Sequence, residues 1–177
     1  MKRQPAKVLT PDDVRLLLSH AEGRRHWHRK RVIILLSFKA GLRAFEIAGL
    51  EWSMVLDSSG SVDELMFLGR GITKGGRPRR LPIHNQLKGG LQALHQCSGR
   101  SHDGPVAKSQ RGGAMTAASI VNWFADIYAK CELDGCSSHS GRGTFVTQAA
   151  RLVAKTEGSL RYVPELAGHR ATTTTKR

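Results

Sequence analysis

The stretch RKRVIILLSFKAGLRAFE, residues 29–46, decides the fold. Its first part, Arg29 to Ala40, is apolar on most sides of a helix and predicts a central, buried helix. Gly41 interrupts that helix, because glycine is unfavourable in a helix interior. Ala44 to Glu51 then predicts a further helix with its apolar residues facing inward. The core is therefore expected to be built from helices.

Further helical patterns lie on both sides of this stretch. Leu9 to Glu22 opens with Thr10 as a cap, Pro11 in the first turn and two aspartates suited to the helix dipole. Apolar residues then recur at helical spacing, which predicts an amphipathic helix. The other predicted helices contain Leu87, Leu91 and Leu94, or span Thr116–Lys130, Ser138–Ala154 and Val163–Gly168.

The segment between these helices has the character of a sheet, with short apolar runs separated by polar residues and glycine. We expect a small antiparallel sheet with Gly75-Gly76 in a hairpin turn, and a loop over Ser98–Gly113. The fold class is therefore α+β, mainly helical with a small antiparallel β-sheet, and residues 1–177 are expected to form one domain. The predicted strands are Met54–Leu56, Glu64–Leu68 and Arg80–Ile83.

The charge points to a polyanionic partner. The chain has 28 Lys+Arg against 14 Asp+Glu, a formal net charge of +14, which makes phosphate polyanions the leading class. Charge alone does not separate double-stranded DNA from structured RNA, and a cluster of basic residues can also be a solvated face. Two basic clusters stand out: Arg24, Arg25, Arg29, Lys30 and Arg31, and then Lys74, Arg77, Arg79 and Arg80.

Membrane and metal-binding classes find little support in the sequence. No stretch approaches the roughly 18 apolar residues of a membrane span, and no signal-peptide core follows the basic start, so a cytoplasmic location is expected. Cys97, Cys131 and Cys136 are odd in number and lack paired CxxC units, which indicates reduced thiols. Cys131, Cys136 and His139 could be drawn as a metal site, but a fourth ligand at family spacing is missing. We therefore expect no metal.

Four motifs follow one another along the chain: GLRAFE at 41–46, TKGGR at 73–77 leading to LPI at 81–83, HSGR at 139–142, and AGH at 167–169 before a run of threonines. In this order and spacing they resemble the catalytic domain of the tyrosine recombinase, or phage integrase, family, from about Leu9 to Arg177. The resemblance implies a site-specific DNA recombinase whose parent cleaves and rejoins DNA through a 3′-phosphotyrosyl intermediate. It also implies no cofactor, double-stranded DNA as partner, and a homotetramer on paired sites.

The resemblance assigns the phosphate-gripping residues. Arg43 and Arg142 match the family's two phosphate arginines, and a guanidinium offers permanently charged, bidentate donors. Glu46, three residues after Arg43, would hold that guanidinium in one rotamer, although an ordinary surface ion pair is the alternative. His139, three residues before Arg142 and near a helix start that Ser137 or Ser138 could cap, would assist proton transfer at the attacking hydroxyl.

The remaining assignments concern the leaving group and the DNA backbone. Lys74 matches the family's hairpin lysine, which protonates the departing 5′ oxygen, and Arg77 is its rival for that role. His169 matches the third basic position, a hydrogen-bond donor to the phosphate. The other basic residues of both clusters are expected to contact backbone phosphates, which position the protein without reading sequence.

The family's nucleophile would lie nine residues after His169, directly beyond Arg177. Tyr128 lies on the apolar face of its predicted helix, and Tyr162 is not at the required spacing. This chain is therefore expected to bind DNA without cleaving it, because no attacking phenol is supplied in cis. The open explanations are a fragment cut before the tyrosine, a natural truncation, or a tyrosine donated by another protomer. A non-catalytic DNA-binding relative is the alternative function.

Two departures from the family pattern carry expectations of their own. Gly141 and Gly143 stand where larger residues are common, so we expect a looser first turn in that helix. The N-terminal core-binding domain of many relatives is expected to be absent, since the catalytic-domain resemblance begins almost at once.

Overall fold

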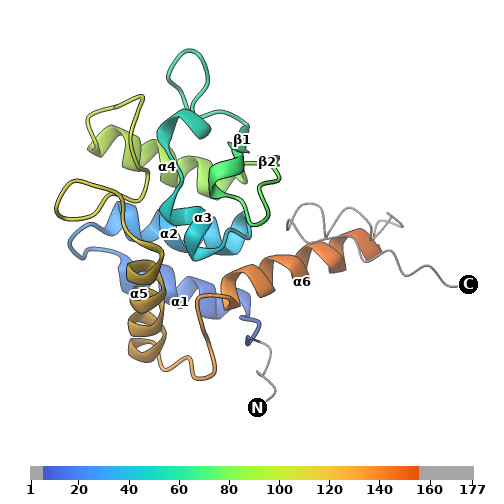
Figure 1. Ribbon diagram of the computed structural model, residues 1–177. Helices are drawn as coiled ribbons and strands as arrows, with labels where there is room; N and C mark the ends of the chain where they lie inside the picture. The colour runs from blue at the N-terminus through green and yellow to red at the C-terminus, as the bar shows by residue number, and fades with distance from the viewer. Residues whose placement is uncertain (1–5, 156–177) are drawn as a thin grey trace, which may run out of the picture.

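The computed structural model describes residues 6–155. Their helices pack around α2, with a small two-stranded sheet at one side of the domain (Figure 1), and this confirms the predicted α+β class. The predicted helix Val163–Gly168 lies outside the described residues, as do His169 and Tyr162. The elements are α1 (Pro11–Ala21), α2 (Trp27–Lys39), α3 (Ala44–Ala48), the 3-10 helix η1 (Trp52–Met54), β1 (Leu65–Leu68), the 3-10 helix η2 (Arg70–Ile72), β2 (Arg79–Pro82), α4 (Asn85–Cys97), α5 (Ala117–Lys130) and α6 (Ser140–Lys155).

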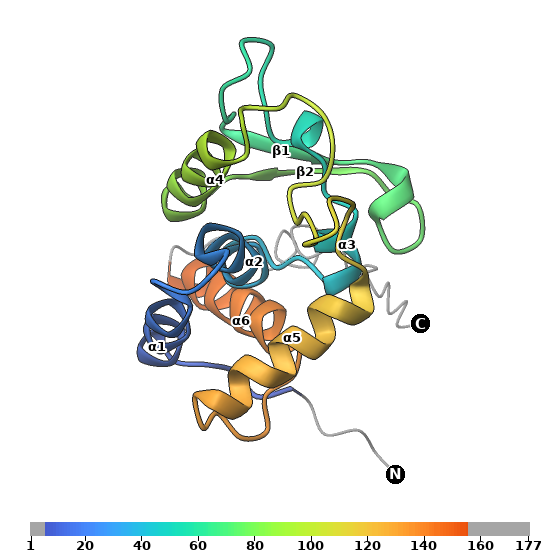
Figure 2. The same ribbon diagram turned by 90° about the vertical axis from the view of Figure 1, so that its left-hand side faces the viewer.

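Helix α2 forms the centre of the domain, as its sequence predicts. Every side chain from Val32 to Phe38 is buried, and the helix packs against α1, α3, α4 and α6. Figure 2 shows α4 and the hairpin on one side of α2, with α1, α5 and α6 on the other. Because α2 is covered on all sides, its sequence reads as a continuous apolar run instead of an amphipathic stripe.

Helix α1 begins with the predicted cap. Thr10 accepts a hydrogen bond from the Asp13 backbone N at 3.2 Å, and the Asp13 carboxylate accepts one from the Thr10 backbone N at 2.8 Å. Pro11 occupies the first turn, where its missing N–H removes no helical hydrogen bond. This reciprocal capping box fixes where the chain enters the domain.

Removing the Thr10 hydroxyl should destabilise the domain. We expect Thr10→Ala to lower the free energy of unfolding by about 1 kcal/mol, since one helix N–H loses its acceptor. Urea denaturation measures the change, with Ser19→Ala, an exposed residue of the same helix, as control. An equal effect of the two substitutions would contradict a specific role for the cap.

The sheet contains one strand fewer than the sequence predicts. β1 pairs antiparallel with β2, from Leu65 opposite Pro82 to Leu68 opposite Arg79. The expected strand Met54–Leu56 is wrong, because the carbonyl of Trp52 accepts the backbone N–H groups of Val55 and Leu56, each at 3.0 Å. These local bonds form the 3-10 turn η1, and the pairing is limited to an isolated antiparallel bridge between Leu56 and Val62.

The connection between the strands is also longer than the expected tight hairpin. It runs from 69 to 78 and contains η2, followed by a turn in which the Gly76 backbone N donates to the Thr73 carbonyl at 3.0 Å. Gly75 has φ +81° and Gly76 has φ +66°, which glycine adopts without steric penalty. The glycine pair therefore forms the predicted turn, but at the tip of a ten-residue excursion.

Helix α3 is shorter than predicted and ends at Ala48. Gly49 follows it, and a Cβ built on Gly49 would lie 2.4 Å from Cγ2 of Ile72. The excursion between the strands thus packs directly onto the end of α3, where only glycine leaves room. Trp52 then turns into the core, with its ring 4.7 Å from the ring of His95.

The glycine at the start of α6 is explained by packing. A Cβ on Gly141 would lie 2.1 Å from Oγ and 2.8 Å from Cβ of Ser37 on α2. Gly141 therefore allows α2 and α6 to approach closely, whereas Gly143 has no such neighbour. Within residues 6–155, every helix is too short or too polar to cross a membrane.

Candidate functional site

The site is organised around one buried carboxylate. Glu46 lies in the first turn of α3 and is fully buried. It accepts a hydrogen bond from the Arg43 backbone N at 2.9 Å, and its Oε1 lies 3.4 Å from Arg43 Nη1. The interaction is therefore an interior one, and the alternative of an ordinary surface ion pair does not hold. Glu46 fixes both the start of α3 and the Arg43 guanidinium.

A second arginine shares this carboxylate. Arg79, on β2, places Nη2 2.8 Å from Glu46 Oε1, and only 12% of its side chain is exposed. Arg77 and Arg80 are exposed. From the sequence, Arg79 was not distinguished from Arg77 and Arg80. Alternation along a strand could have done so, because Arg79 lies two residues before buried Leu81 and therefore shares its face of β2.

Arg142 completes the cluster from the first turn of α6. Its side chain is buried, and Nη1 donates to the Gly41 carbonyl at 2.7 Å. Burial and the nearby Arg43 lower the pKa of Arg142 to about 10, with Glu46 opposing the shift and Arg79 adding to it. Arg142 remains protonated at neutral pH. Two guanidinium groups thus contact one carboxylate and a third interacts with it electrostatically, and this concentration of positive charge is suited to an oxyanion.

His139 lies at the rim of this cluster. It is exposed and directly precedes α6, and its carbonyl accepts the Gly143 backbone N at 2.9 Å. Ser137 Oγ accepts the His139 backbone N at 3.3 Å, which is a local bond before the helix, and His139 stands directly before Ser140 where the sequence places Ser137 or Ser138 as the cap. The histidine stands beside a helix N-terminus, where backbone N–H groups favour an anion.

Lys74 is held near the site but not in it. The excursion that carries it is anchored on one side by Ile72 against Gly49 and on the other by Arg79 against Glu46. Lys74 and Arg77 lie between these anchors, and both are exposed. Both residues thus lie on a short exposed tip with fixed ends.

The N-terminal basic cluster lies at the other end of α2 from this site. Arg24 and Arg25 are exposed before the helix, and Arg29 in its first turn donates to the Lys108 carbonyl. Lys30 and Arg31 are half-buried on the same turns. With about 1.5 Å per residue, the length of α2 separates this cluster from Gly41 by roughly 18 Å. The two clusters are therefore distinct surfaces.

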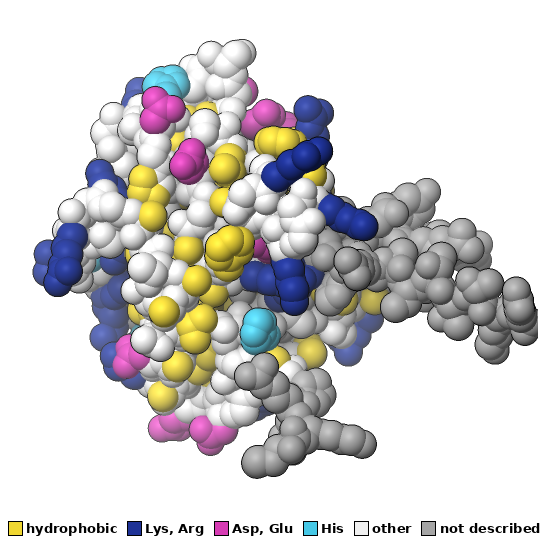
Figure 3. Space-filling view, in the orientation of Figure 1, with side chains coloured by type: hydrophobic (Ala, Val, Ile, Leu, Met, Phe, Trp, Pro, Cys, Tyr) yellow, Lys and Arg dark blue, Asp and Glu magenta, His cyan; other side chains and the backbone are white. Residues whose placement is uncertain are grey.

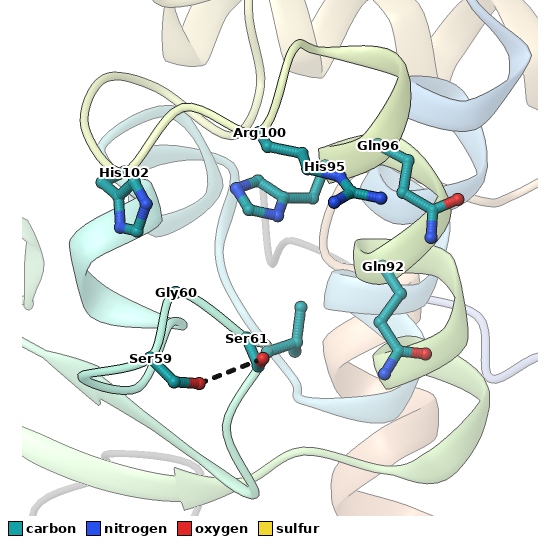
Figure 4. Close-up of a pocket in the computed structure, with 9 residues that line it drawn as sticks. Ser59, Gly60, Ser61, Gln92, His95, Gln96, Arg100 and His102 are labelled. Atoms are coloured by element: carbon teal, nitrogen blue, oxygen red, sulfur yellow. Dashed lines mark hydrogen bonds between the residues drawn. The ribbon is translucent and has the colours of Figure 1, made fainter.

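The distribution of basic side chains on the surface also shows two separate clusters. In Figure 3, Lys and Arg side chains gather between the hairpin and the start of α6, with a histidine beside them, and again at the left edge of the same face. A separate open pocket of about 630 Å³ lies between the 59–62 loop and α4 (Figure 4), and none of the predicted site residues lines it. Among residues 6–155, no three His, Cys, Asp or Glu side chains come together as a metal site.

Comparison with known proteins identifies the family. The profile of the phage integrase family matches residues 7–177. The tyrosine recombinase XerC of Xylella fastidiosa (strain 9a5c) is 28% identical over 148 residues, which cover 84% of this chain and 47% of the relative. XerC of Myxococcus xanthus is 30% identical over 158 residues, covering 84% and 49%. The chain therefore spans about half the length of these curated relatives.

Solved structures share the fold. The Tn1549 transposon integrase in complex with transposon right end DNA superposes with a TM-score of 0.75 at 18% identity, over 98% of this chain and 61% of that one. XerA recombinase gives 0.72 at 19% identity, over 98% and 59%. An integrase from mycobacterium phage Brujita gives 0.65 at 27% identity, over 98% and 54%. The fold is that of tyrosine recombinase catalytic domains, and the chain belongs to the phage integrase family.

Proposed function

We propose that this chain is the catalytic domain of a site-specific tyrosine recombinase and that its arginine cluster holds the scissile phosphate of double-stranded DNA. The observation that carries the proposal is the gathering of Arg43, Arg79 and Arg142 around buried Glu46. The three guanidinium groups place permanent positive charge and N–H donors in one cluster, which matches the charge and the acceptor oxygens of a phosphate diester. Preformed donors of this kind stabilise the extra negative charge of a pentacoordinate phosphate without reorganising during the reaction.

The other roles follow from the family resemblance. A tyrosine hydroxyl attacks phosphorus, its proton passes to His139, and the P–O5′ bond breaks as Lys74 gives a proton to the leaving 5′ oxygen. His169, outside the described residues, donates to a phosphate oxygen. Arg43 and Arg142 supply the positive charge that metal ions supply in other phosphoryl-transfer sites, so the proposal needs no cofactor.

The nucleophile is proposed to follow directly after Arg177. Tyr128 is unsuited to the role, because it is buried in α5 and burial raises its pKa far above the ordinary value. By this proposal the chain of 177 residues binds DNA without cleaving it, and the longer parent performs the cleavage. The parent acts as a tetramer on paired sites, in the cytoplasm where its DNA is found. DNA complexes of the Tn1549 and lambda integrases support the choice of partner.

A nicked duplex that traps the covalent intermediate tests the proposal. The recombination site is first selected from a random duplex library, and the 177-residue chain is compared with the protein extended past Arg177. We expect both to bind, and only the extended protein to form a covalent adduct that resists SDS. In the extended protein, Arg43→Ala should slow adduct formation at least about a hundredfold, as loss of one oxyanion donor does elsewhere.

Each result has a defined meaning. An adduct formed by the 177-residue chain would overturn the assignment of the nucleophile to a position beyond Arg177. A folded extended protein that binds its site but forms no adduct would favour the alternative, a non-catalytic DNA-binding relative. Equal or tighter binding of structured RNA, unaffected by Arg43→Ala, would contradict DNA as the partner.

A further inference from the structure

Arg79 differs from its neighbours Arg77 and Arg80 in its burial and in its ion pair. Arg80 projects to solvent from the same strand, whereas Arg79 is held 2.8 Å from the carboxylate that also holds Arg43. Its Nε and Nη2 atoms are buried, and neither makes a hydrogen bond with the described residues, so the contact with Glu46 is an ion pair only. A buried guanidinium with unsatisfied N–H groups is energetically costly unless a ligand accepts them.

The surroundings favour an anionic ligand. Arg43, Arg142 and Arg79 approach one another closely enough that each of the other two disfavours the charged form of Arg142. Glu46 is the carboxylate that opposes this effect, and it is already shared between Arg43 and Arg79. An oxyanion placed among the three guanidinium groups would relieve their repulsion and accept the idle N–H groups of Arg79.

We propose that Arg79 is a third phosphate-binding arginine of this pocket, donating from Nε to an oxygen of the bound phosphate while Nη2 stays paired with Glu46. The inference rests on the proposed function. It adds Arg79, which lies between the TKGGR and LPI segments and belongs to neither. It separates Arg79 from Arg77 and Arg80, which lie exposed on the outside of the hairpin.

Binding of inorganic phosphate to the 177-residue chain tests the proposal without knowledge of the DNA target. A ligand that binds only the native state raises the free energy of unfolding by RT ln(1 + L/Kd), where L is the free ligand concentration, so phosphate affinity is obtained from the shift in urea midpoint with phosphate concentration, against chloride of equal ionic strength. Phosphate also stabilises proteins generally, and Arg43→Ala gives that non-specific background. Arg70→Ala is the matched control, because Arg70 is exposed at the base of the same hairpin.

The substitution Arg79→Lys separates direct contact from a role through Glu46. Lysine keeps the positive charge beside Glu46. Its single ammonium group replaces the guanidinium, so the separate N–H donor at Nε of arginine is lost. We expect Arg79→Lys to keep the stability of the wild type in chloride and to weaken phosphate binding about tenfold, because one charge-assisted hydrogen bond is lost. Arg79→Ala should weaken phosphate binding at least as much and also lower stability in chloride.

The possible failures point to different errors. Full phosphate affinity in Arg79→Lys would overturn direct contact, since Arg79 would then act only by holding Glu46. Equal behaviour of Arg79→Ala and Arg70→Ala, with affinity lost in Arg43→Ala, would remove Arg79 from the pocket but leave the proposed function intact. If phosphate stabilises the wild type no more than Arg43→Ala, the pocket itself is contradicted.

Discussion

Replacing Glu46 with alanine is expected to lower the free energy of unfolding by about 3 kcal/mol. The carboxylate is fully buried, and its removal takes away the ion-pair partner of Arg43 and Arg79 and the negative charge that offsets repulsion at Arg142. Removing one partner of a buried ion pair costs about 3–5 kcal/mol, and the lower figure applies because Arg43 and Arg79 keep some contact with solvent. Urea denaturation in chloride measures the change.

Two comparisons make the experiment specific. Glu46→Gln keeps the shape and can still accept the Arg43 backbone N–H, so its loss of stability should be smaller than that of Glu46→Ala. Phosphate should restore more stability to Glu46→Gln than it adds to the wild type, since it supplies the missing negative charge. Glu64→Ala is the surface control, because Glu64 is exposed in its ion pair with Lys88. An effect of Glu46→Ala no larger than that of Glu64→Ala would contradict the buried cluster.

Replacing Gly141 with alanine is expected to destabilise the domain by about 2 kcal/mol. The added methyl group would meet the Ser37 hydroxyl at 2.1 Å, and overpacking of this kind costs about 1–3 kcal/mol. Alanine is favoured over glycine inside a helix by about 1 kcal/mol, which offsets only part of the cost of a severe clash. The same substitution at Gly143, where no atom lies closer than 4.0 Å to the added carbon, should be neutral or stabilising.

A double-mutant cycle with Ser37 tests the cause. Ser37 Oγ has no hydrogen-bond partner among the described residues, so Ser37→Ala removes the closest atom without breaking a hydrogen bond. Ser37→Gly also removes the Cβ that lies 2.8 Å from the added carbon. Gly141→Ala should therefore be partly relieved by Ser37→Ala and more fully by Ser37→Gly. Additive effects would show that the two positions do not meet.

The sequence predicts those parts of the fold whose signals are local. The cap at Thr10, the buried run from Val32 to Phe38 and the glycine turn before β2 were all recognisable, because capping, burial and positive φ each leave a mark at the residue concerned. The strand expected at Met54–Leu56 was wrong because a short apolar run suits a 3-10 turn as well as a ladder. A 3-10 turn and a strand with the same residues are distinguished only by whether a pairing partner exists elsewhere in the chain.

The candidate site was recognised through motifs, but its geometry was not. Arg43 and Arg142 do come together near Glu46. Lys74 lies outside the cluster on an exposed tip. The inward direction of Arg79 follows from its two-residue spacing to Leu81, but its ion pair with Glu46 depends on β2 lying beside α3, which no local pattern reveals. Gly141 was expected to loosen a helix, and it instead permits two helices to touch, a fact that requires knowing which helices are neighbours.

The hydrogen bond from Arg142 to Gly41 makes the orientation of this arginine insensitive to most point mutations. Its acceptor is a main-chain carbonyl, which no side-chain substitution can delete. Gly41 itself has φ +63°, and a Cβ there would lie 2.4 Å from the ring of Phe145 on α6. A shift of the backbone between α2 and α3 would therefore displace the acceptor of Arg142 Nη1, and the close approach of Phe145 couples that backbone to the seating of α6 on the core.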